Sequence, residues 1–169
     1  MTIIVNWVEL DDPIESCIEI PLFDEVFVIY YCNKVITRTE WRLQQQGSSI
    51  RNNHKWQSLH QYLNNPTNTL MLNLKKQGTD YRHKVWAEMC KIPVAQTCSY
   101  SELAARIGSG ARAVANACRD NPFPGIIPCH RVVAVSGVGG YMGQTAGRFL
   151  DIKVKLLANE STIVKKSPQ

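Results

Sequence analysis

The segment 126–133 joins the two residue types that thiol chemistry requires, a cysteine and a histidine, at adjacent positions. The thiolate is the nucleophilic form of cysteine, so Cys129 needs a nearby base, and the imidazole of His130 is suited to that task near neutral pH. His130 can act directly or through a water molecule. Pro128 fixes the backbone just before the thiol and disfavours a helix there, which predicts a rigid turn. The segment therefore predicts a preorganised reactive cysteine.

Three helices are predicted ahead of this segment. Apolar residues recur four apart over residues 81–89 and predict the first helix. Residues 99–102 (Ser-Tyr-Ser-Glu) form a capping box, which begins the second helix, and the glycines at 108–110 end it. The third helix is predicted over residues 111–119, where an Asn-Pro pair then stops it. Two short helices joined by a glycine turn make a helix-turn-helix.

The third helix carries one arginine among small side chains. Ala111, Ala113, Ala115 and Ala117 leave little bulk around Arg112, so the backbone can approach a narrow surface such as a DNA minor groove. An arginine that projects alone from such a helix is suited to fill the gap left by a flipped base. The alternative is that alanine is simply the best helix former and that Arg112 is a solvated surface charge. The helix alone favours the second interpretation, because a helix-turn-helix is often only architecture.

The first part of the chain favours strands. Three apolar or alternating stretches, at residues 3–5, 17–20 and 26–31, predict a small antiparallel sheet. Apolar residues at helical spacing over 56–63 predict an amphipathic helix on that sheet, and a short strand is expected around 70–74. The fold class predicted is therefore α+β, with a small sheet and a helix followed by a mainly helical unit.

Composition limits the class of protein. The 169 residues, 44% of them hydrophobic, suffice for one ordinary domain or two small ones. No apolar run approaches the roughly 20 residues needed to cross a bilayer, and residues 1–10 lack the features of a signal peptide, so we expect a cytoplasmic protein. The six cysteines show no Cys-x-x-Cys pair and no zinc-module spacing. We expect reduced thiols and no metal.

Positive charge gathers in the second half of the chain. Residues 1–79 contain seven Lys and Arg against eight Asp and Glu, whereas residues 80–169 contain twelve against six. The sequence pI of about 8.9 is compatible with a polyanionic partner such as nucleic acid. Charge alone does not establish that partner.

Taken together, the motifs of the last ninety residues resemble those of the O6-alkylguanine-DNA alkyltransferases, also called methylated-DNA–protein-cysteine methyltransferases. The matched residues occur in the family's order. They are Gly78-Thr79, Val85-Trp86, Ile92-Pro93, Ser99 to Ala104, Ala111 to Val114, Asn121-Pro122, Pro128 to Val133, Gly140-Tyr141, Leu156-Leu157 and Glu160.

The resemblance implies a Cys-His-Glu relay. Cys129 matches the alkyl acceptor, His130 the residue that deprotonates it through water, and Glu160 the carboxylate that orients the histidine. The implied activity is an irreversible, single-turnover transfer of the alkyl group from O6-alkylguanine to Cys129, mainly from O6-methylguanine, with O4-methylthymine as a further candidate. No cofactor is expected, because a soft thiolate can displace the alkyl group unaided.

The resemblance also implies contacts with double-stranded DNA, approached from the minor groove. Tyr100 matches the tyrosine that forms a hydrogen bond with the flipped base. Arg112 matches the arginine finger that takes the place of the extruded nucleotide in the duplex. Asn121 matches a hinge between the helix-turn-helix and the acceptor loop, and Tyr141 a pocket wall. The full set of implied DNA- and substrate-binding positions is Tyr100, Ala111, Arg112, Ala113, Asn121, Val132 and Tyr141.

Domain organisation follows from the same resemblance. Residues 1–75 fit the variable, ribonuclease-H-like N-terminal domain in size and strand pattern, and residues 76–169 fit the C-terminal domain that binds DNA and accepts the alkyl group. We expect a monomer with no membrane association and no obligate protein partner. Arg131 is expected to anchor the acceptor loop and not to take part in the chemistry.

Some features depart from the family pattern. Met142 follows Tyr141 where many relatives have a small residue or serine, which leaves the pocket width open. Glu160 is expected near the end of a helix over about 145–158, where a carboxylate opposes the helix dipole. Cys17 and Cys32 lack a full zinc ligand set.

Three alternatives stay open. The first is a non-catalytic relative that binds alkylated lesions and flags them for other repair proteins, although that group lacks the cysteine. The second is a cysteine hydrolase with multiple turnovers. The third is a helix-turn-helix transcription factor, which would prefer an operator sequence over a lesion.

Overall fold

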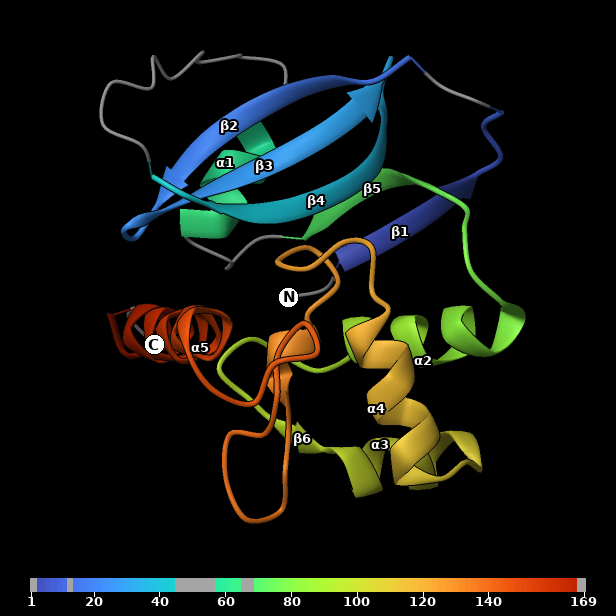
Figure 1. Cartoon of the computed structure of the whole chain (residues 1–169), viewed down its shortest axis with the longest axis vertical. Coiled ribbons are helices and arrows are strands. Elements are labelled where there is room, and N and C mark those ends of the chain that lie inside the picture. Colours follow the sequence, from blue (N-terminus) through green and yellow to red (C-terminus); the bar gives the residue numbers. More distant parts are fainter. Residues whose placement is uncertain (1–2, 12–13, 45–56, 65–68, 167–169) are drawn as a thin grey trace.

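The protein has an α+β fold in which a five-stranded sheet lies over a group of helices and loops (Figure 1). The computed structural model describes residues 3–11, 14–44, 57–64 and 69–166. The elements of the first half are β1 (Ile3–Val8), β2 (Ser16–Leu22), β3 (Glu25–Cys32), β4 (Val35–Leu43), α1 (Gln57–Asn64) and β5 (Leu70–Lys75). Within these ranges, no helix has the length and apolarity required to cross a membrane.

The sheet is mixed, which corrects the prediction of a purely antiparallel one. Its order is β1-β5-β4-β3-β2, where β2, β3 and β4 pair antiparallel, but β5 pairs parallel with both β1 and β4. The segment containing α1 connects β4 to β5, and a connection with a helix is what parallel neighbours require. Alternation predicts which residues form strands, but it does not say which strands become neighbours.

Strand β4 was absent from the three strands predicted in this part of the chain. Its buried Thr37, Thr39 and Trp41 alternate with the more exposed Arg38 and Glu40. This period of two is the pattern of a strand with one face toward the core. The alternation was present in the sequence, but two of its buried positions are threonines, so it did not show as an alternation of apolar and polar residues.

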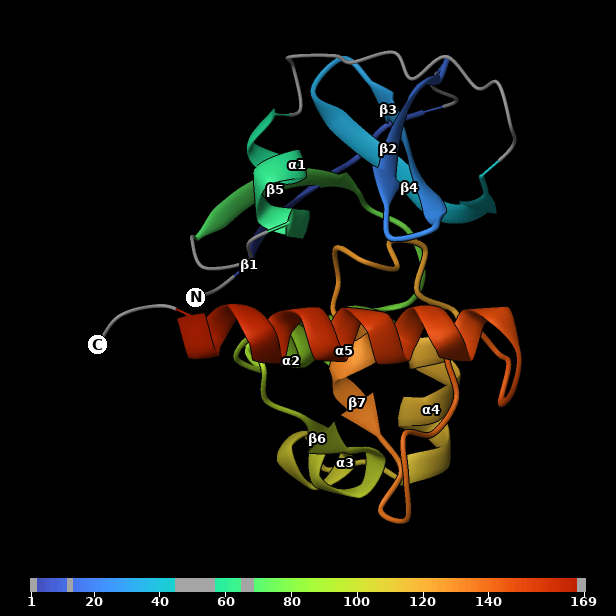
Figure 2. The ribbon, with the colours of Figure 1, turned by 90° about the vertical axis from the view of Figure 1, so that its left-hand side faces the viewer.

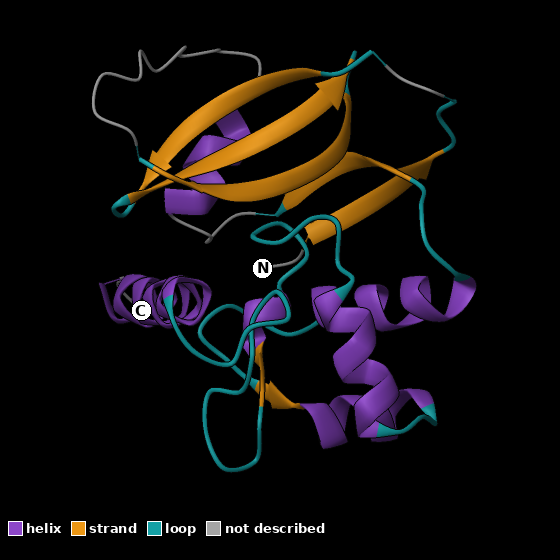
Figure 3. Ribbon diagram, in the orientation of Figure 1, coloured by secondary structure: helices purple, strands orange, loops and turns teal. Residues whose placement is uncertain are grey.

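The second half contains mainly helices (Figure 3). They are α2 (Asp80–Cys90), α3 (Tyr100–Ile107), α4 (Ala111–Arg119) and α5 (Arg148–Lys166), with a short 3-10 helix η2 (Cys129–Arg131) and two short strands, β6 (Cys98–Ser99) and β7 (Val132–Val133). The predicted capping box is confirmed, because Ser99 accepts from the Glu102 amide and the Glu102 carboxylate accepts from the Ser99 amide. Gly108 ends α3 in the left-handed conformation.

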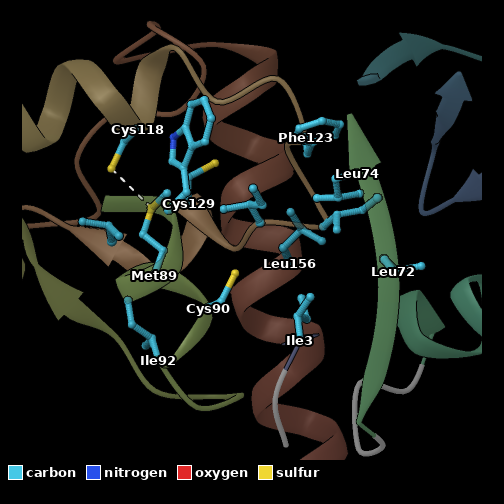
Figure 4. Close-up of a cluster of buried hydrophobic side chains, with 14 of the residues drawn as sticks. Ile3, Leu72, Leu74, Met89, Cys90, Ile92, Cys118, Phe123, Cys129 and Leu156 are labelled. Atoms are coloured by element: carbon cyan, nitrogen blue, oxygen red, sulfur yellow. Dashed lines mark hydrogen bonds between the residues drawn. The ribbon is translucent and has the colours of Figure 1, made fainter. Parts of the chain in front are cut away.

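One hydrophobic core joins the two halves. It extends from Leu74 on β5 through Phe123 to Met89 on α2 and to Cys118 and Cys129 (Figure 4). The turn that contains Cys129 is therefore part of the same core as the sheet and the helices.

Ala117 belongs to this core and not to the exposed alanine face predicted for α4. It is 2% exposed, and its carbonyl accepts a hydrogen bond of 2.9 Å from the indole Nε1 of Trp86. Position 117 lies three residues after Val114 and directly before Cys118, so helical geometry places it on the buried side of α4. Ala111 and Ala113 remain accessible beside Arg112.

Helix α5 crosses the helical half on the side that Figure 2 presents. The predicted end near residue 158 was wrong, since the helix continues to Lys166. Glu160 thus lies inside the helix, where the unfavourable interaction with the dipole at its end is reduced.

Candidate active site

Cys129 lies on the wall of a cavity of about 270 Å³. It opens η2 directly after Pro128, and its side chain is buried, with 4% of the residue exposed. The cavity is also lined by Tyr100 from α3, by Cys118 near the end of α4, and by Tyr141 and Met142 from the following loop. The thiol is therefore packed against the core on one side and faces a pocket that opens to solvent on the other.

Asn121 is the side chain that contacts the Cys129 sulfur. Its Nδ2 donates to the carbonyl of Ile127 at 3.0 Å and to Cys129 Sγ at 3.2 Å, and its Oδ1 accepts from the Phe123 amide at 2.9 Å. The buried amide thus ties the end of α4 to the turn that carries the cysteine. Burial raises the pKa of the Cys129 thiol, and the Asn121 hydrogen bond opposes that rise. The resting cysteine is a thiol at neutral pH.

Glu160 brings His130 and Arg131 together. His130 Nε2 lies 2.8 Å from Glu160 Oε1, and Arg131 Nη2 lies 2.8 Å from the same oxygen. The other oxygen, Oε2, accepts from the amide of Ala95 at 3.0 Å. Burial alone would raise the pKa of the Glu160 carboxyl, but its bonds to His130 and Arg131 lower it to about 2. Glu160 is therefore an ion at neutral pH.

The state of His130 follows from these neighbours. Burial lowers its pKa, the positive charge of Arg131 adds to that effect, and Glu160 opposes it. The imidazole is therefore neutral near pH 7, and Nε2 carries the proton that it donates to the carboxylate. The free lone pair is then on Nδ1, which is buried and has no hydrogen-bond partner among the described residues.

The His130 imidazole makes no direct hydrogen bond with the Cys129 sulfur in the described residues. This argues against the direct route for deprotonation, and the route through a water molecule stays a prediction.

Arg131 anchors the turn, as predicted. Besides Glu160, it donates to the carbonyl of Ile92 at 2.8 Å and approaches the hydroxyl of Tyr62 on α1 at 3.4 Å. Its guanidinium is buried and fully engaged with the protein. It holds η2 against both halves of the molecule.

The remaining predicted substrate residues occupy different places. The Tyr100 hydroxyl donates to the Gly140 carbonyl at 3.4 Å, and burial raises its pKa to about 12. Tyr141 is buried on the cavity wall. Val132 is buried behind the cavity, and its side chain is not among those that line it.

Arg112 lies outside the cavity on the exposed side of α4. Its side chain makes no hydrogen bond or ion pair with any described residue, and the small Ala111 and Ala113 flank it. Later residues of the same helix, Asn116 and Arg119, line the cavity. One helix therefore connects the projecting arginine with the space beside Cys129.

The sequence reasoning missed Lys153. This α5 residue is fully buried, and its Nζ donates to the carbonyls of Val132 at 2.6 Å and Gly140 at 2.8 Å. Burial lowers its pKa to about 8. Lys153 precedes Glu160 by two helical turns, so both lie on the same side of α5. The spacing of seven residues between Lys153 and Glu160 was the sequence feature that could have indicated that Lys153 faces the site.

Met142 bends the loop at the cavity. Its φ of 50° is uncommon for a residue with a side chain, and it precedes Gly143, whose φ is 80°. The Met142 side chain lines the cavity next to Tyr141. It is therefore a determinant of the cavity's shape.

No metal ligand set is found. Among the described residues, no three His, Cys, Asp or Glu side chains are grouped as a metal site would require. Cys17 and Cys32 lie on β2 and β3, and both are free thiols.

Comparison with known proteins gives consistent matches. The family model described as 6-O-methylguanine DNA methyltransferase, DNA binding domain, matches residues 80–162. A probable methylated-DNA–protein-cysteine methyltransferase of Acanthamoeba polyphaga mimivirus is 43% identical over 86 residues, which are 49% of this chain and 58% of the relative. The methylated-DNA–protein-cysteine methyltransferase of Methanosarcina mazei is 38% identical over 109 residues, 63% of this chain and 66% of the relative. The matches thus span about three fifths of these relatives.

Solved structures extend the likeness to nearly the whole chain. The crystal structure of Mycobacterium tuberculosis O6-methylguanine methyltransferase has a TM-score of 0.71 and 27% identity, covering 92% of this chain and 96% of the other. A structure of the M. tuberculosis protein in complex with DNA has a TM-score of 0.66 and 27% identity, covering 87% and 93%.

The fold and the buried Cys129, His130 and Glu160 define a protein with a cysteine on the wall of a pocket and a hydrogen-bonded His-Glu pair next to it. The chain belongs to the family of the methylated-DNA–protein-cysteine methyltransferases, as its motifs implied.

Proposed function

We propose that this protein repairs DNA by moving the alkyl group of O6-alkylguanine onto Cys129, once per molecule. The observation that carries the proposal is the Cys129 thiol on the wall of a cavity of about 270 Å³, beside a neutral His130 held by an ionised Glu160. This volume is just below the roughly 300 to 1,000 Å³ of pockets for drug-sized ligands, which suits a single base.

The proposed chemistry is a displacement at carbon. His130 Nδ1 takes the thiol proton through a water molecule, and the sulfur attacks the alkyl carbon of the flipped base. The S–C bond forms while the bond from carbon to guanine O6 breaks, and the proton passes to the departing guanine, which becomes a normal base. Tyr100, whose raised pKa keeps its hydroxyl protonated, donates a hydrogen bond to the base. The thioether is stable to water, so the protein is consumed and needs no cofactor.

The proposed DNA surface is the helix-turn-helix formed by α3 and α4. Arg112 enters the duplex in place of the flipped nucleotide, while Ala111 and Ala113 allow close approach from the minor groove. Asn121 couples α4 to the acceptor, since its amide touches both the turn and the sulfur. Val132 is proposed to contribute through its backbone, because its side chain does not line the cavity.

We further propose the domain division at residues 75 and 76, with a ribonuclease-H-like N-terminal unit. A monomer without an obligate protein partner and a cytoplasmic location stay predictions. O4-methylthymine stays a candidate second substrate.

Mass spectrometry tests the proposed activity. After incubation with a duplex containing O6-methylguanine, the Cys129 peptide should gain the mass of one methylene while the lesion disappears in equal amount. Cys129→Ala should bind the duplex and transfer nothing. An unmodified peptide with an intact lesion would support the lesion-binding alternative, and repeated turnover on an ester would support the hydrolase.

A further inference from the structure

The N-terminal sheet reaches the loop that precedes the acceptor. On β4, the Thr39 amide donates to the carbonyl of Pro122 at 2.9 Å, and its hydroxyl donates to the carbonyl of Pro124 at 2.8 Å. Figures 1 and 2 both show this loop rising from the end of α4 toward the sheet before it returns to η2. The first half of the chain therefore holds the backbone of the acceptor loop.

Trp41 lies two residues further along β4, on the same buried side. It is 4% exposed, and its ring lies 4.8 Å from that of Phe27 between centroids. A Cβ at Gly125, whose φ is 86°, would come within 3.3 Å of Trp41 and 2.8 Å of Phe27. The two aromatic rings thus fit closely against the acceptor loop, where only glycine leaves enough room.

The indole also makes a polar contact with the cavity wall. Its Nε1 donates to the hydroxyl of Tyr141 at 3.2 Å, across 100 positions of sequence and within the buried interior. The described residues supply no acceptor for the proton of that hydroxyl. Tyr141 lines the same cavity as Cys129. Because Trp41 occupies one lone pair of the phenol oxygen, the O–H bond must point away from the indole.

We propose that Trp41 is a positioning residue of the acceptor cavity, which orients the Tyr141 hydroxyl so that its proton is offered to the bound base. This inference rests on the proposed alkyl transfer and deepens it. It gives the N-terminal sheet a part in catalysis, since a donor fixed before the base arrives need not reorganise during the reaction. The contribution acts through Tyr141, and Trp41 itself touches neither base nor sulfur.

A double-mutant cycle tests the proposal. Single-turnover transfer from an O6-methylguanine duplex is measured for the unaltered protein, Trp41→Phe, Tyr141→Phe and the double variant. Each single variant should lower the maximal rate by ~3- to 10-fold, as expected for one hydrogen bond, with the apparent affinity for the duplex unchanged. The double variant should be no slower than Tyr141→Phe, because Trp41 acts only through the hydroxyl.

Phe27→Leu is the matched control. It changes the packing around Trp41 and Gly125 but leaves the indole N–H and the Tyr141 hydroxyl intact. It should lower the melting temperature while leaving the maximal rate unchanged. A similar loss of rate in this variant would show that the slower transfer of Trp41→Phe comes from altered packing and not from the lost hydrogen bond.

Other outcomes separate this inference from the proposed function. If the unaltered protein transfers methyl groups and Trp41→Phe transfers them equally fast, the positioning role is wrong and the activity stands. Additive losses in the double variant would also overturn it. If Trp41→Phe does not fold, Tyr141→Phe alone decides, since an unchanged rate there removes the hydroxyl from the reaction. If the unaltered protein transfers nothing, the proposed function fails.

Discussion

His130 and Glu160 are 30 positions apart in sequence, yet Nε2 and Oε1 lie 2.8 Å apart in the buried interior. The carboxylate also accepts from Arg131 and from the Ala95 amide, so it is held from three directions. This set of contacts fixes which imidazole nitrogen carries the proton and leaves Nδ1 as the base. A short helical turn and a long helix must dock correctly for the histidine to function.

The first prediction concerns stability in acid. The pKa of Glu160 is lowered from 4.5 in the unfolded chain to about 2 in the folded one, so the unfolded state binds its proton first as pH falls. The carboxylate therefore stabilises the fold fully above pH 4.5, and this contribution, about 3 kcal/mol, is lost as pH falls toward 2.

Urea unfolding between pH 7 and pH 3 measures this effect. Glu160→Gln, which has no charge to lose, should be less stable at pH 7 and should show a flatter decline below pH 4.5. Parallel curves for the two proteins would contradict the assignment of the acid sensitivity to Glu160.

The second prediction concerns the rate of transfer as a function of pH. Because the pKa of His130 is lowered below 6.5, the neutral base persists to more acid pH than an ordinary histidine. The single-turnover rate should be level from pH 8 down to 6.5 and should fall only in more acid solution. Glu160→Gln should weaken the orientation of the ring and slow transfer at every pH. A rate that halves at or above pH 6.5 would contradict the lowered pKa.

The third prediction concerns the effect of Lys153→Met on stability and on transfer. The side chain satisfies the carbonyls of Val132 and Gly140, and Gly140 directly precedes Tyr141 in the cavity wall. Loss of the ammonium takes this donor from the buried Val132 carbonyl, at a cost of about 1 to 3 kcal/mol, whereas the Gly140 carbonyl keeps the Tyr100 hydroxyl as a donor. Transfer should also slow, because the loop that carries Tyr141 loses its attachment to α5.

Lys155→Met is the matched control, two residues along the same helix. Lys155 pairs with Asp24 at the surface, where solvent screens such pairs and they contribute little to stability. Urea unfolding and single-turnover transfer should separate the two variants clearly. Equal losses of stability and transfer rate in the two variants would contradict the role given to the buried Lys153.

Local signals predicted much of the helical half. The capping box at Ser99 and the glycine at 108 act within a few residues, so the bounds of α3 followed from sequence alone. The parallel pairing of β1 with β5 did not, because it joins strands that are 67 positions apart. Such pairing depends on the packing of the complete core and not on local preference.

The candidate site divides in the same way. Cys129 and His130 are adjacent, so their types alone drew attention to them. Trp41 carries no local mark of function, and Lys153 has only its spacing from Glu160. Both contact the cavity wall only through the docking of β4 and α5. Their part in the site depends on contacts between distant elements, which a single sequence does not reveal.

The last prediction concerns Arg112. Its side chain is exposed and makes no hydrogen bond or ion pair with any described residue, so Arg112→Ala should leave the free energy of unfolding unchanged. In the proposed complex the arginine fills the gap of the flipped nucleotide, and its loss makes extrusion of the base less favourable. Transfer from a lesion in a duplex should fall by ~10-fold, since about 1.4 kcal/mol suffices for that change.

Transfer from the same lesion in a single-stranded oligonucleotide should be unaffected, because that strand has no stacked gap to fill. Lys91→Ala, at the end of α2 and outside the proposed DNA surface, removes an equal charge and should spare both substrates at fixed ionic strength. If Arg112→Ala lowers both rates equally, the arginine acts by general attraction to phosphate, and the finger role is wrong.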